Sequence, residues 1–450
     1  MTAKTPEKPP TSLRTFLIIW GGQLVSGIGS RMTSFALAIW AWELTGKATP
    51  LSLIMFFTHV PTVIAAIFAG VLVDRWNRKQ MMIGCDAVVG FSTIAILLLS
   101  ASNNLEIWHI YLIGAINGLF GYIQNLAFSA SMSVIVPKEH YARASAMMSI
   151  QLSISVILGP VCAGAVYPLV GLVGILMIDI ITFIIAATTL WFIDIPQPKN
   201  AEIENSSGSK IWHELTFGFR YIFQRPSLLA VLIFLMGSNF MGQSSGSGLI
   251  APMILARTDN NPAILASTQA AFGFGISVGA TVLTLWGGPK LRINGMLVGN
   301  ALTEFSKILF ALGREPLVWI TTATTTGFFS PWMGSFNQAI WLSKVDPAIQ
   351  GKVFATRYLI VQMTVPLGLA IGGPLADYVF EPAMKTGGSL AGIFGGLFGT
   401  GAGAGIAFQI ALFAFCSILI SIVGYAFHPL RNVEAIVPDH DEFKESKVMS

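Results

Sequence analysis

The stretch Gly70-Val71-Leu72-Val73-Asp74-Arg75-Trp76-Asn77-Arg78-Lys79 places one acid and three bases in a short turn between two apolar runs. Lysine and arginine gather in the cytoplasmic loops of membrane proteins, and lipid phosphates attract them, which explains the bases. Asp74 is not explained in this way, because a carboxylate weakens that attraction. Gly70 would allow close helix approach, and Asn77 would tolerate a left-handed turn. The stretch therefore predicts a tight cytoplasmic turn between two membrane-spanning helices.

The composition is that of a membrane protein throughout. Of the 450 residues, 54% are hydrophobic and 11% are charged, whereas about 25% are charged in a soluble domain. These values exclude a soluble enzyme, a disordered chain and a secreted disulfide scaffold. Long apolar runs, rather than alternating polarity, also exclude a transmembrane barrel. The three cysteines, Cys85, Cys162 and Cys416, lie inside apolar runs, where we expect them to pack as small hydrophobic residues.

Twelve apolar segments are long enough to cross the hydrocarbon core, which takes about 20 residues. They are residues 16–43, 51–73, 80–101, 107–135, 142–167, 172–193, 227–255, 263–286, 292–312, 316–343, 353–380 and 403–427. With both termini in the cytoplasm, the inner loops and tails hold 19 of the 26 basic residues and the outer loops hold four. This asymmetry predicts that orientation in a cell (plasma or inner) membrane, although the net charge is only +4.

The longest internal polar stretch, residues 194–226, divides the spans six and six. It contains the linker-like Ser206-Ser207-Gly208-Ser209, followed by apolar residues at helical spacing that predict a helix on the membrane surface. The predicted organisation is therefore a tail (1–15), a six-helix bundle (16–193), a cytoplasmic linker with an interfacial helix (194–226), a second six-helix bundle (227–428) and a tail (429–450). A repeat at an offset of 209 residues, as between Arg143 and Lys352, suggests that the bundles arose by duplication.

The opening stretch resembles the loop signature G-x-x-x-D-R-x-G-R-R/K of the major facilitator superfamily, with Asn77 in place of the second glycine. The resemblance implies an all-α fold of twelve transmembrane helices in two six-helix bundles. It also implies a gating loop, in which Asp74 faces the cytoplasmic end of helix eleven and holds the halves shut on the inside. The loop residues carried over from the family are Gly70, Asp74, Arg75, Arg78 and Lys79.

Other stretches resemble the macrolide-efflux and enterobactin-exporter-like branch of that family. These are residues 23–29 with 43–46, residues 372–377 with 380–382, and residues 431–434 with 438–439. Antiporters of the family carry a glycine-proline motif in helix five, which Gly159, Pro160 and Gly164 match and Ser155 and Ala163 do not. An ordinary proline kink is an equally good interpretation.

Ionisable residues inside the spans are expensive in lipid and are therefore site candidates. The proton-coupling candidates are, in order, Glu304, Asp179 and Asp86. Each has a structural alternative. Lys307, three residues away, could neutralise Glu304. Asp179 could form hydrogen bonds between helices, and Asp86 could support the loop around Asp74.

Polar residues within the spans are too numerous for a lipid-facing surface. The candidates for a substrate cavity are Arg31, Gln124, Asn239, Gln243, Asn337 and Gln362. Their alternative role is polar contact between helices. Arg31 has no acid three or four positions away, and its guanidinium suits carboxylate or phosphate groups, which favours an anionic substrate. The alternative is that Arg31 pairs with Asp86 or Asp179 across helices.

Enzyme signals are weak. The segment 242–246 matches the G-x-S-x-G nucleophile pattern, but it lies in an apolar helix and not after a strand. We therefore predict no catalytic residue, no metal site and no cofactor. The predicted function is a secondary active transporter, with proton-coupled efflux of an amphipathic small molecule such as a drug or siderophore. Its partners would be that small-molecule substrate, protons and the lipid bilayer, with no nucleic acid, and it would be a monomer. The alternatives are an importer or symporter of the same fold, and a non-transporting membrane sensor.

Overall fold

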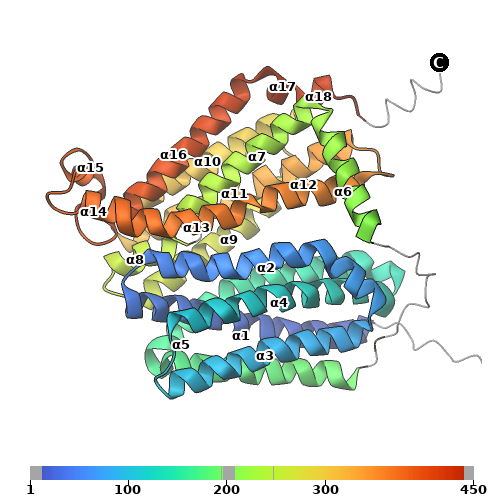
Figure 1. Ribbon diagram of the computed structural model, residues 1–450, viewed down its shortest axis with the longest axis horizontal. Coiled ribbons are helices and arrows are strands. Elements are labelled where there is room, and N and C mark those ends of the chain that lie inside the picture. Colours follow the sequence, from blue (N-terminus) through green and yellow to red (C-terminus); the bar gives the residue numbers. More distant parts are fainter. Residues whose placement is uncertain (1–12, 194, 196–207, 247, 440–450) are drawn as a thin grey trace, which may run out of the picture. The chain divides into compact units, whose positions relative to one another are not determined.

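The computed structural model describes residues 13–193, 195, 208–246 and 248–439 (Figure 1). The side chains of Val71, Asp74 and residues 208–215 are outside this description. The chain divides into two compact units, one of residues 1–37 and 57–205 and the other of residues 38–56 and 206–450. Every regular element in the described residues is a helix, as lipid requires when each backbone group must find its partner within its own segment.

The first helices are α1 (Leu13–Thr45), α2 (Ala48–Arg75), α3 (Arg78–Ala101), α4 (Ile107–Ile135), η1 (Lys138–His140) and α5 (Tyr141–Phe192). In α5 the backbone leaves helical geometry at Gly171, with φ 63° and ψ −167°. Such a positive φ suits glycine, which has no Cβ. The 52-residue α5 therefore consists of two helical segments, which correspond to predicted spans five and six.

The remaining helices follow after the linker. They are α6 (Gly208–Phe223), α7 (Pro226–Ser245), α8 (Ile250–Arg257), α9 (Pro262–Trp286), α10 (Arg292–Leu312), α11 (Pro316–Lys344), α12 (Gln350–Gln362), α13 (Thr364–Leu375), the π-helical turn η2 (Ala376–Phe380), α14 (Glu381–Met384), α15 (Ala391–Phe398), α16 (Ala404–Ala426), α17 (His428–Arg431) and α18 (Val433–Ile436). The helix predicted in the linker is thus present as α6, which packs on α12 and α7.

Nine helical stretches in the described residues are long and apolar enough to cross a membrane. One of them, the 55-residue stretch Lys138–Phe192, is long enough for two crossings. The helices α4 and α11 occupy predicted spans four and ten but are not among the nine. In α11 the threonine hydroxyls donate back to carbonyls in the preceding turn, as Thr326 does to Thr322 at 2.7 Å, so their polarity is satisfied within the helix.

The first unit has a core built from all of its long helices. Phe16 of α1 stacks on Phe128 of α4, and Met82 of α3 is fully buried in the same cluster. Close backbone approach tightens this packing. A Cβ added at Gly118 of α4 would lie 2.0 Å from the carbonyl oxygen of Thr58 of α2, so any larger residue there would push the two helices apart.

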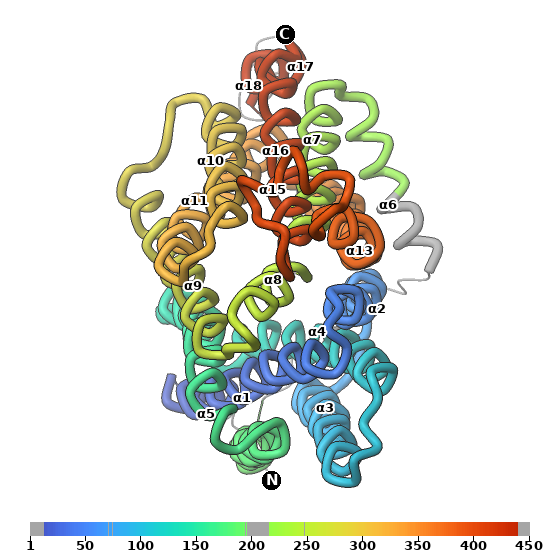
Figure 2. Tube along the Cα trace, turned by 90° about the vertical axis from the view of Figure 1, so that its left-hand side faces the viewer, coloured from blue at the N-terminus to red at the C-terminus, as the bar shows by residue number. Residues whose placement is uncertain are grey.

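In the second unit, α10 lies between α11 and α16 (Figure 2). A buried cluster around Trp341 includes Leu430 and Val433 from the segment after α16. The buried Lys344 at the end of α11 donates to the carbonyl of Glu434 at 2.7 Å and pairs with Asp439 at 2.8 Å. These contacts fasten residues 428–439 to the end of the second unit.

Candidate functional site

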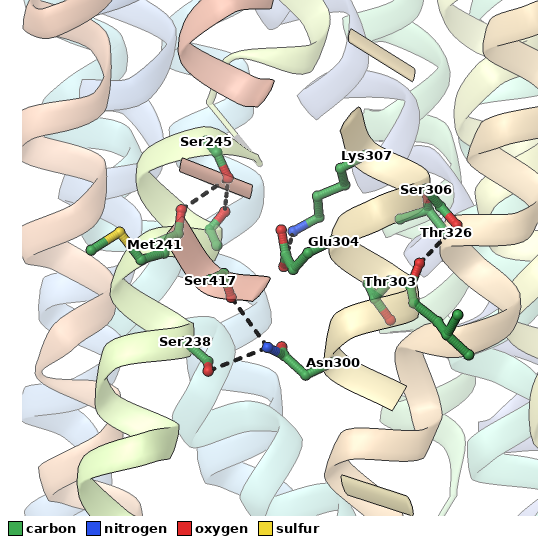
Figure 3. Close-up of polar contacts among 12 residues, drawn as sticks. Ser238, Met241, Ser245, Asn300, Thr303, Glu304, Ser306, Lys307, Thr326 and Ser417 are labelled. Atoms are coloured by element: carbon green, nitrogen blue, oxygen red, sulfur yellow. Dashed lines mark hydrogen bonds and ion pairs between the residues drawn. The ribbon is translucent and has the colours of Figure 1, made fainter. Parts of the chain in front are cut away.

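Glu304 and Lys307 form an ion pair on α10, with 2.8 Å between Lys307 Nζ and Glu304 Oε1. Glu304 is 3% exposed, and its Oε2 accepts no hydrogen bond from a described residue. The pair faces α7 (Figure 3), where an added Cβ at Gly242 would lie 3.8 Å from Lys307 Nζ. The sequence alternative, in which the two charges neutralise each other, is therefore the arrangement in the structure.

One turn along α10, Asn300 joins three helices. Its Nδ2 is 3.4 Å from the hydroxyl of Ser238 on α7 and 3.2 Å from that of Ser417 on α16 (Figure 3). It is also 2.9 Å from the hydroxyl of Ser421 on α16. All four residues are at most 5% exposed. Since polar side chains commonly hydrogen-bond across membrane helices, this network fixes the packing around the Glu304–Lys307 pair.

Asp86 of α3 lies at the end of a chain of amides in the first unit. Gln23 of α1 donates from Nε2 to Asp86 Oδ2 at 3.2 Å. Gln124 of α4 donates in turn to Gln23 Oε1 at 3.0 Å. The candidate Gln124 thus lies with the candidate Asp86, and Gln23 connects them.

Asp179 of α5 is surrounded by hydroxyl donors and is 4% exposed. The hydroxyls of Thr33 and Ser30 on α1 donate to it at 2.8 and 3.3 Å. That of Thr93 on α3 donates at 3.5 Å. No cation lies within ion-pair distance of Asp179 in the described part of the chain. Two carboxylates of the first unit, the half-buried Asp86 and the buried Asp179, are therefore held by neutral groups.

Arg31 does not pair with either carboxylate, so the alternative based on such a pair is wrong for the described residues. Its side chain is exposed, and its Cβ packs on α5 beside Gly159. A Cβ added at Gly159 would lie 2.3 Å from the Cβ of Arg31. Gly159, Pro160 and Gly164 are buried, and the backbone around them stays helical. Gly159 therefore provides the close packing that positions Arg31 on α1.

The other cavity candidates lie on α7, α11 and α12 of the second unit. Asn239 makes no hydrogen bond to a described residue, and Asn337 Oδ1 is buried without one. Gln362 donates to the hydroxyl of Tyr358 at 3.4 Å. The Cβ of Gln243 on α7 faces α13, 2.8 Å from a Cβ added at Gly368.

The predicted gating loop lies at the junction of α2 and α3. Arg78 donates to the carbonyl of Ala130 at 2.8 Å, and Lys79 donates to that of Trp191 at 3.0 Å. Both bases are thus anchored to neighbouring helices of their own unit. Arg75 is exposed, at the end of α2. The side chain of Asp74 lies outside the described residues, so its predicted role is not tested.

Two local expectations for this loop need correction. A Cβ added at Gly70 would meet no atom within 4 Å, so the structure shows no close helix approach there. Asn77 has φ −65° and is extended, not left-handed. Its side chain accepts from the backbone NH of Gln80 at 3.1 Å and caps α3. Asparagine is among the best N-cap residues, which explains why it can stand at the family's glycine position.

Sequence reasoning missed the neutral partners of the buried acids, Gln23, Ser30, Thr33 and Thr93. Ser30 and Thr33 are three residues apart and share a helix face, a spacing that could have marked them as a pair. Their acid is about 150 positions away along the chain, and no local pattern indicates that contact.

The chain has relatives among known membrane transporters. Residues 19–368 match the Major Facilitator Superfamily. Macrolide efflux protein A of Streptococcus pyogenes is 26% identical over 369 residues, which are 81% of this chain and 90% of that protein. The enterobactin exporter EntS of Shigella flexneri is 21% identical over 348 residues, 76% of this chain and 77% of that protein. The resemblance to this branch is thereby confirmed.

The fold is also that of solved transporters. A bacterial homologue of the human lysosomal transporter Spinster, in an inward-facing and unoccupied conformation, superposes with a TM-score of 0.67. It is 14% identical, and the match covers 93% of this chain and 97% of that one. With a family match over most of its length and these relatives, the chain is a multi-pass cell-membrane transporter, not an enzyme, and it belongs to the major facilitator superfamily.

Proposed function

We propose that this transporter exports an amphipathic small molecule in exchange for protons. Its relatives include proteins named for macrolide efflux and for enterobactin export. Both names describe outward transport. The transporter would alternate between inward-open and outward-open states, with both termini in the cytoplasm.

We further propose twelve spans in two six-helix halves. The non-helical Gly171 supports two crossings within α5. The stretches α7–α8 and α12–α14 each supply one long crossing interrupted by a short break. The helices α4 and α11 are 29 residues each, which is long enough to cross.

The carboxylates within the spans support proton coupling. A carboxylate in a membrane span is costly while ionised unless a cation or water balances it, and binding a proton removes that cost. Asp179 is 4% exposed and has only hydroxyl donors, whereas Glu304 is balanced by Lys307 at 2.8 Å. This contrast moves Asp179 ahead of Glu304 as the proton carrier, and Asp86 remains the third candidate.

The energy available from this exchange is sufficient for export. One proton moving down about 100 mV supplies about 2.3 kcal/mol. Each tenfold of concentration requires about 1.4 kcal/mol, so one net charge supports roughly 50-fold accumulation.

Arg31 supports an acid-bearing substrate. It is a cation within α1 that has no acidic partner among the described residues, and its side chain is exposed. A guanidinium offers a planar set of donors that matches a carboxylate or phosphate. We therefore favour an anionic or acid-bearing metabolite over a purely cationic drug.

Vesicles of known orientation with an imposed pH gradient test the proposal. A labelled macrolide and a labelled enterobactin-type siderophore serve as the probes. Everted vesicles should accumulate the substrate when their interior is acidic, while accumulation only by right-side-out vesicles would support the importer. Asp179→Asn should abolish pH-driven accumulation but leave exchange of labelled for unlabelled substrate. The matched control is Glu315→Gln, an exposed acid whose side chain makes no capping bond. Full pH-driven accumulation by Asp179→Asn would refute its role as the carrier.

A further inference from the structure

The end of α1 and the beginning of α2 belong to a different compact unit from the rest of these two helices. Residues 38–56 group with the unit of residues 206–450, whereas the remainder of α1 and α2 belongs to the other unit. We call residues 38–56 the α1–α2 tip. At its centre Ala48, Leu51 and Ser52 are 0%, 5% and 1% exposed. The first turn of α2 is therefore buried within the second unit.

The Asp377 side chain caps the N-terminus of α2. The backbone NH of Ala48 donates to its Oδ1 at 2.8 Å, and that of Thr49 donates to its Oδ2 at 2.7 Å. The Thr49 hydroxyl donates to the same Oδ2. The first backbone NH groups of a helix have no partner within it and carry partial positive charge. A carboxylate in this position satisfies two of them and balances that charge.

Glycines allow the two backbones to meet beside this contact. A Cβ added at Gly373 would lie 2.6 Å from the Cα of Thr49 and 2.9 Å from the Cβ of Ser52. A Cβ added at Gly248 would lie 2.3 Å from the Ser52 hydroxyl oxygen. Because backbone atoms cannot turn aside, any larger residue at Gly373 would force α2 away.

The backbone that carries Asp377 has an unusual geometry. In the π-helical turn η2, the NH of Glu381 donates to the carbonyl of Ala376, five residues back. Glu381 itself accepts from the NH of Ile406 at 2.9 Å, in the first turn of α16. Two acids four residues apart thus cap two different helices. Single π-turns within α-helices are often found at functional positions.

Two side-chain contacts at the edge of the α1–α2 tip complete its attachment. The indole NH of Trp42 donates to Asn260 Oδ1 at 2.7 Å. The ammonium of Lys47 lies 5.7 Å from the centre of the Tyr378 ring. Both are polar contacts at an exposed rim, where water can replace them. The interface therefore includes hydrogen bonds and close glycine contacts beside the buried Leu51.

We propose that Asp377 is an outer latch of the transport cycle. Its carboxylate would hold the α1–α2 tip on the second unit while the outer side is closed, and the tip would leave when that side opens. The proposal rests on the proposed function and orientation, in which residues 38–56 and 377–385 lie on the outside. It would be the outer counterpart of the inner contact predicted for Asp74, with an acid at a helix N-terminus in each case.

A cysteine reporter in the interface tests the latch without any substrate. Cys85, Cys162 and Cys416 are first replaced by serine, and Ser52→Cys is then labelled on intact cells with a membrane-impermeant maleimide. Asp377→Ala should raise the labelling rate about tenfold, because the closed state loses its cap. Thr49→Ala, which removes one of the three bonds and leaves Asp377 in place, should raise it less. Gly373→Ala should raise it as well, since its Cβ prevents closure.

Matched controls separate the latch from general damage. Gly392→Ala adds a Cβ that meets no atom within 4 Å, and Glu315→Ala removes an exposed acid that caps nothing. Both should leave the Ser52→Cys rate unchanged. Ser389→Cys lies in an exposed outer turn and should be labelled at the same rate in every variant.

Two results would overturn the proposal, and they can be told apart. If Ser389→Cys labels but Ser52→Cys labels no faster in both Asp377→Ala and Thr49→Ala, Asp377 is not a latch, although the proposed transport function stands. If Ser389→Cys cannot be labelled from outside, the proposed orientation fails, and the outer position of the latch fails with it.

Discussion

Removing either charge of the Glu304–Lys307 pair should cost more stability than removing both. Lys307→Met leaves Glu304, which is 3% exposed and already has one unpartnered oxygen, without its cation at 2.8 Å. An orphaned buried charge typically costs about 3–5 kcal/mol, whereas an apolar replacement of both partners is often nearly neutral. Because the Lys307 side chain is 17% exposed, we expect about 3 kcal/mol, at the low end of that range, for Lys307→Met and for Glu304→Gln. The double variant should lose about 1 kcal/mol or less.

Thermal unfolding of the purified protein in detergent, followed by tryptophan fluorescence, measures these differences. The control is Thr303→Ala, next to Glu304, whose hydroxyl bonds only to the carbonyl of Gly299 in its own helix. If the losses of the two single variants simply add in the double variant, the pair does not act as a unit and the reasoning is refuted. A stable double variant that keeps pH-driven transport would also exclude Glu304 as the proton carrier.

Asp74→Asn should impair transport far more than Asn77→Gly at matched membrane expression. Glycine at an N-cap position lowers helix stability by only about a few tenths of a kcal/mol, so Asn77→Gly should be mild. Equal transport by Asp74→Asn and the wild type would contradict the gating role. Arg31→Gln should weaken export of anionic compounds and spare neutral ones in the vesicle assay, and an equal loss for both would make Arg31 purely structural. The hydrogen bond from Lys344 holds the pKa of Asp439 below its ordinary value, so this contact should stabilise the C-terminal segment above about pH 4 and be lost only as the pH falls through the lowered pKa. Limited proteolysis should therefore cut the segment at one rate between about pH 5 and 7.5, with Asp439→Asn cut faster throughout; protection lost within that range would refute this sign.

The candidate site was predictable where it depends on spacing along one helix. Glu304 and Lys307 are three residues apart, so their pairing follows from helical geometry alone. The expense of a charge in lipid likewise marks Asp86 and Asp179 as candidates before any fold is known. The neutral partners of these acids could not be predicted, since they come from other helices whose rotation and depth are set by packing.

Asn77 shows the opposite case, in which a residue preference suggested the wrong local geometry. Asparagine tolerates the left-handed conformation, which led us to expect such a turn, but Asn77 is extended and caps α3. A side chain that accepts from Gln80 at 3.1 Å stabilises the helix start by a different route. The turn between α2 and α3 therefore forms with an asparagine N-cap in place of the family's glycine.

By itself, the sequence determined that this protein is a membrane protein. It also determined the approximate positions of the helices along the chain and the family to which the protein belongs. Those properties depend on apolar length and on short motifs, which act locally. Only the tertiary structure decided that Asp179 is held by three hydroxyls from α1 and α3, and that Asp377 caps the start of α2. The partners in the second contact are about 330 residues apart in the chain. They meet because glycines let two helices approach, and such an approach depends on the packing of every helix between them.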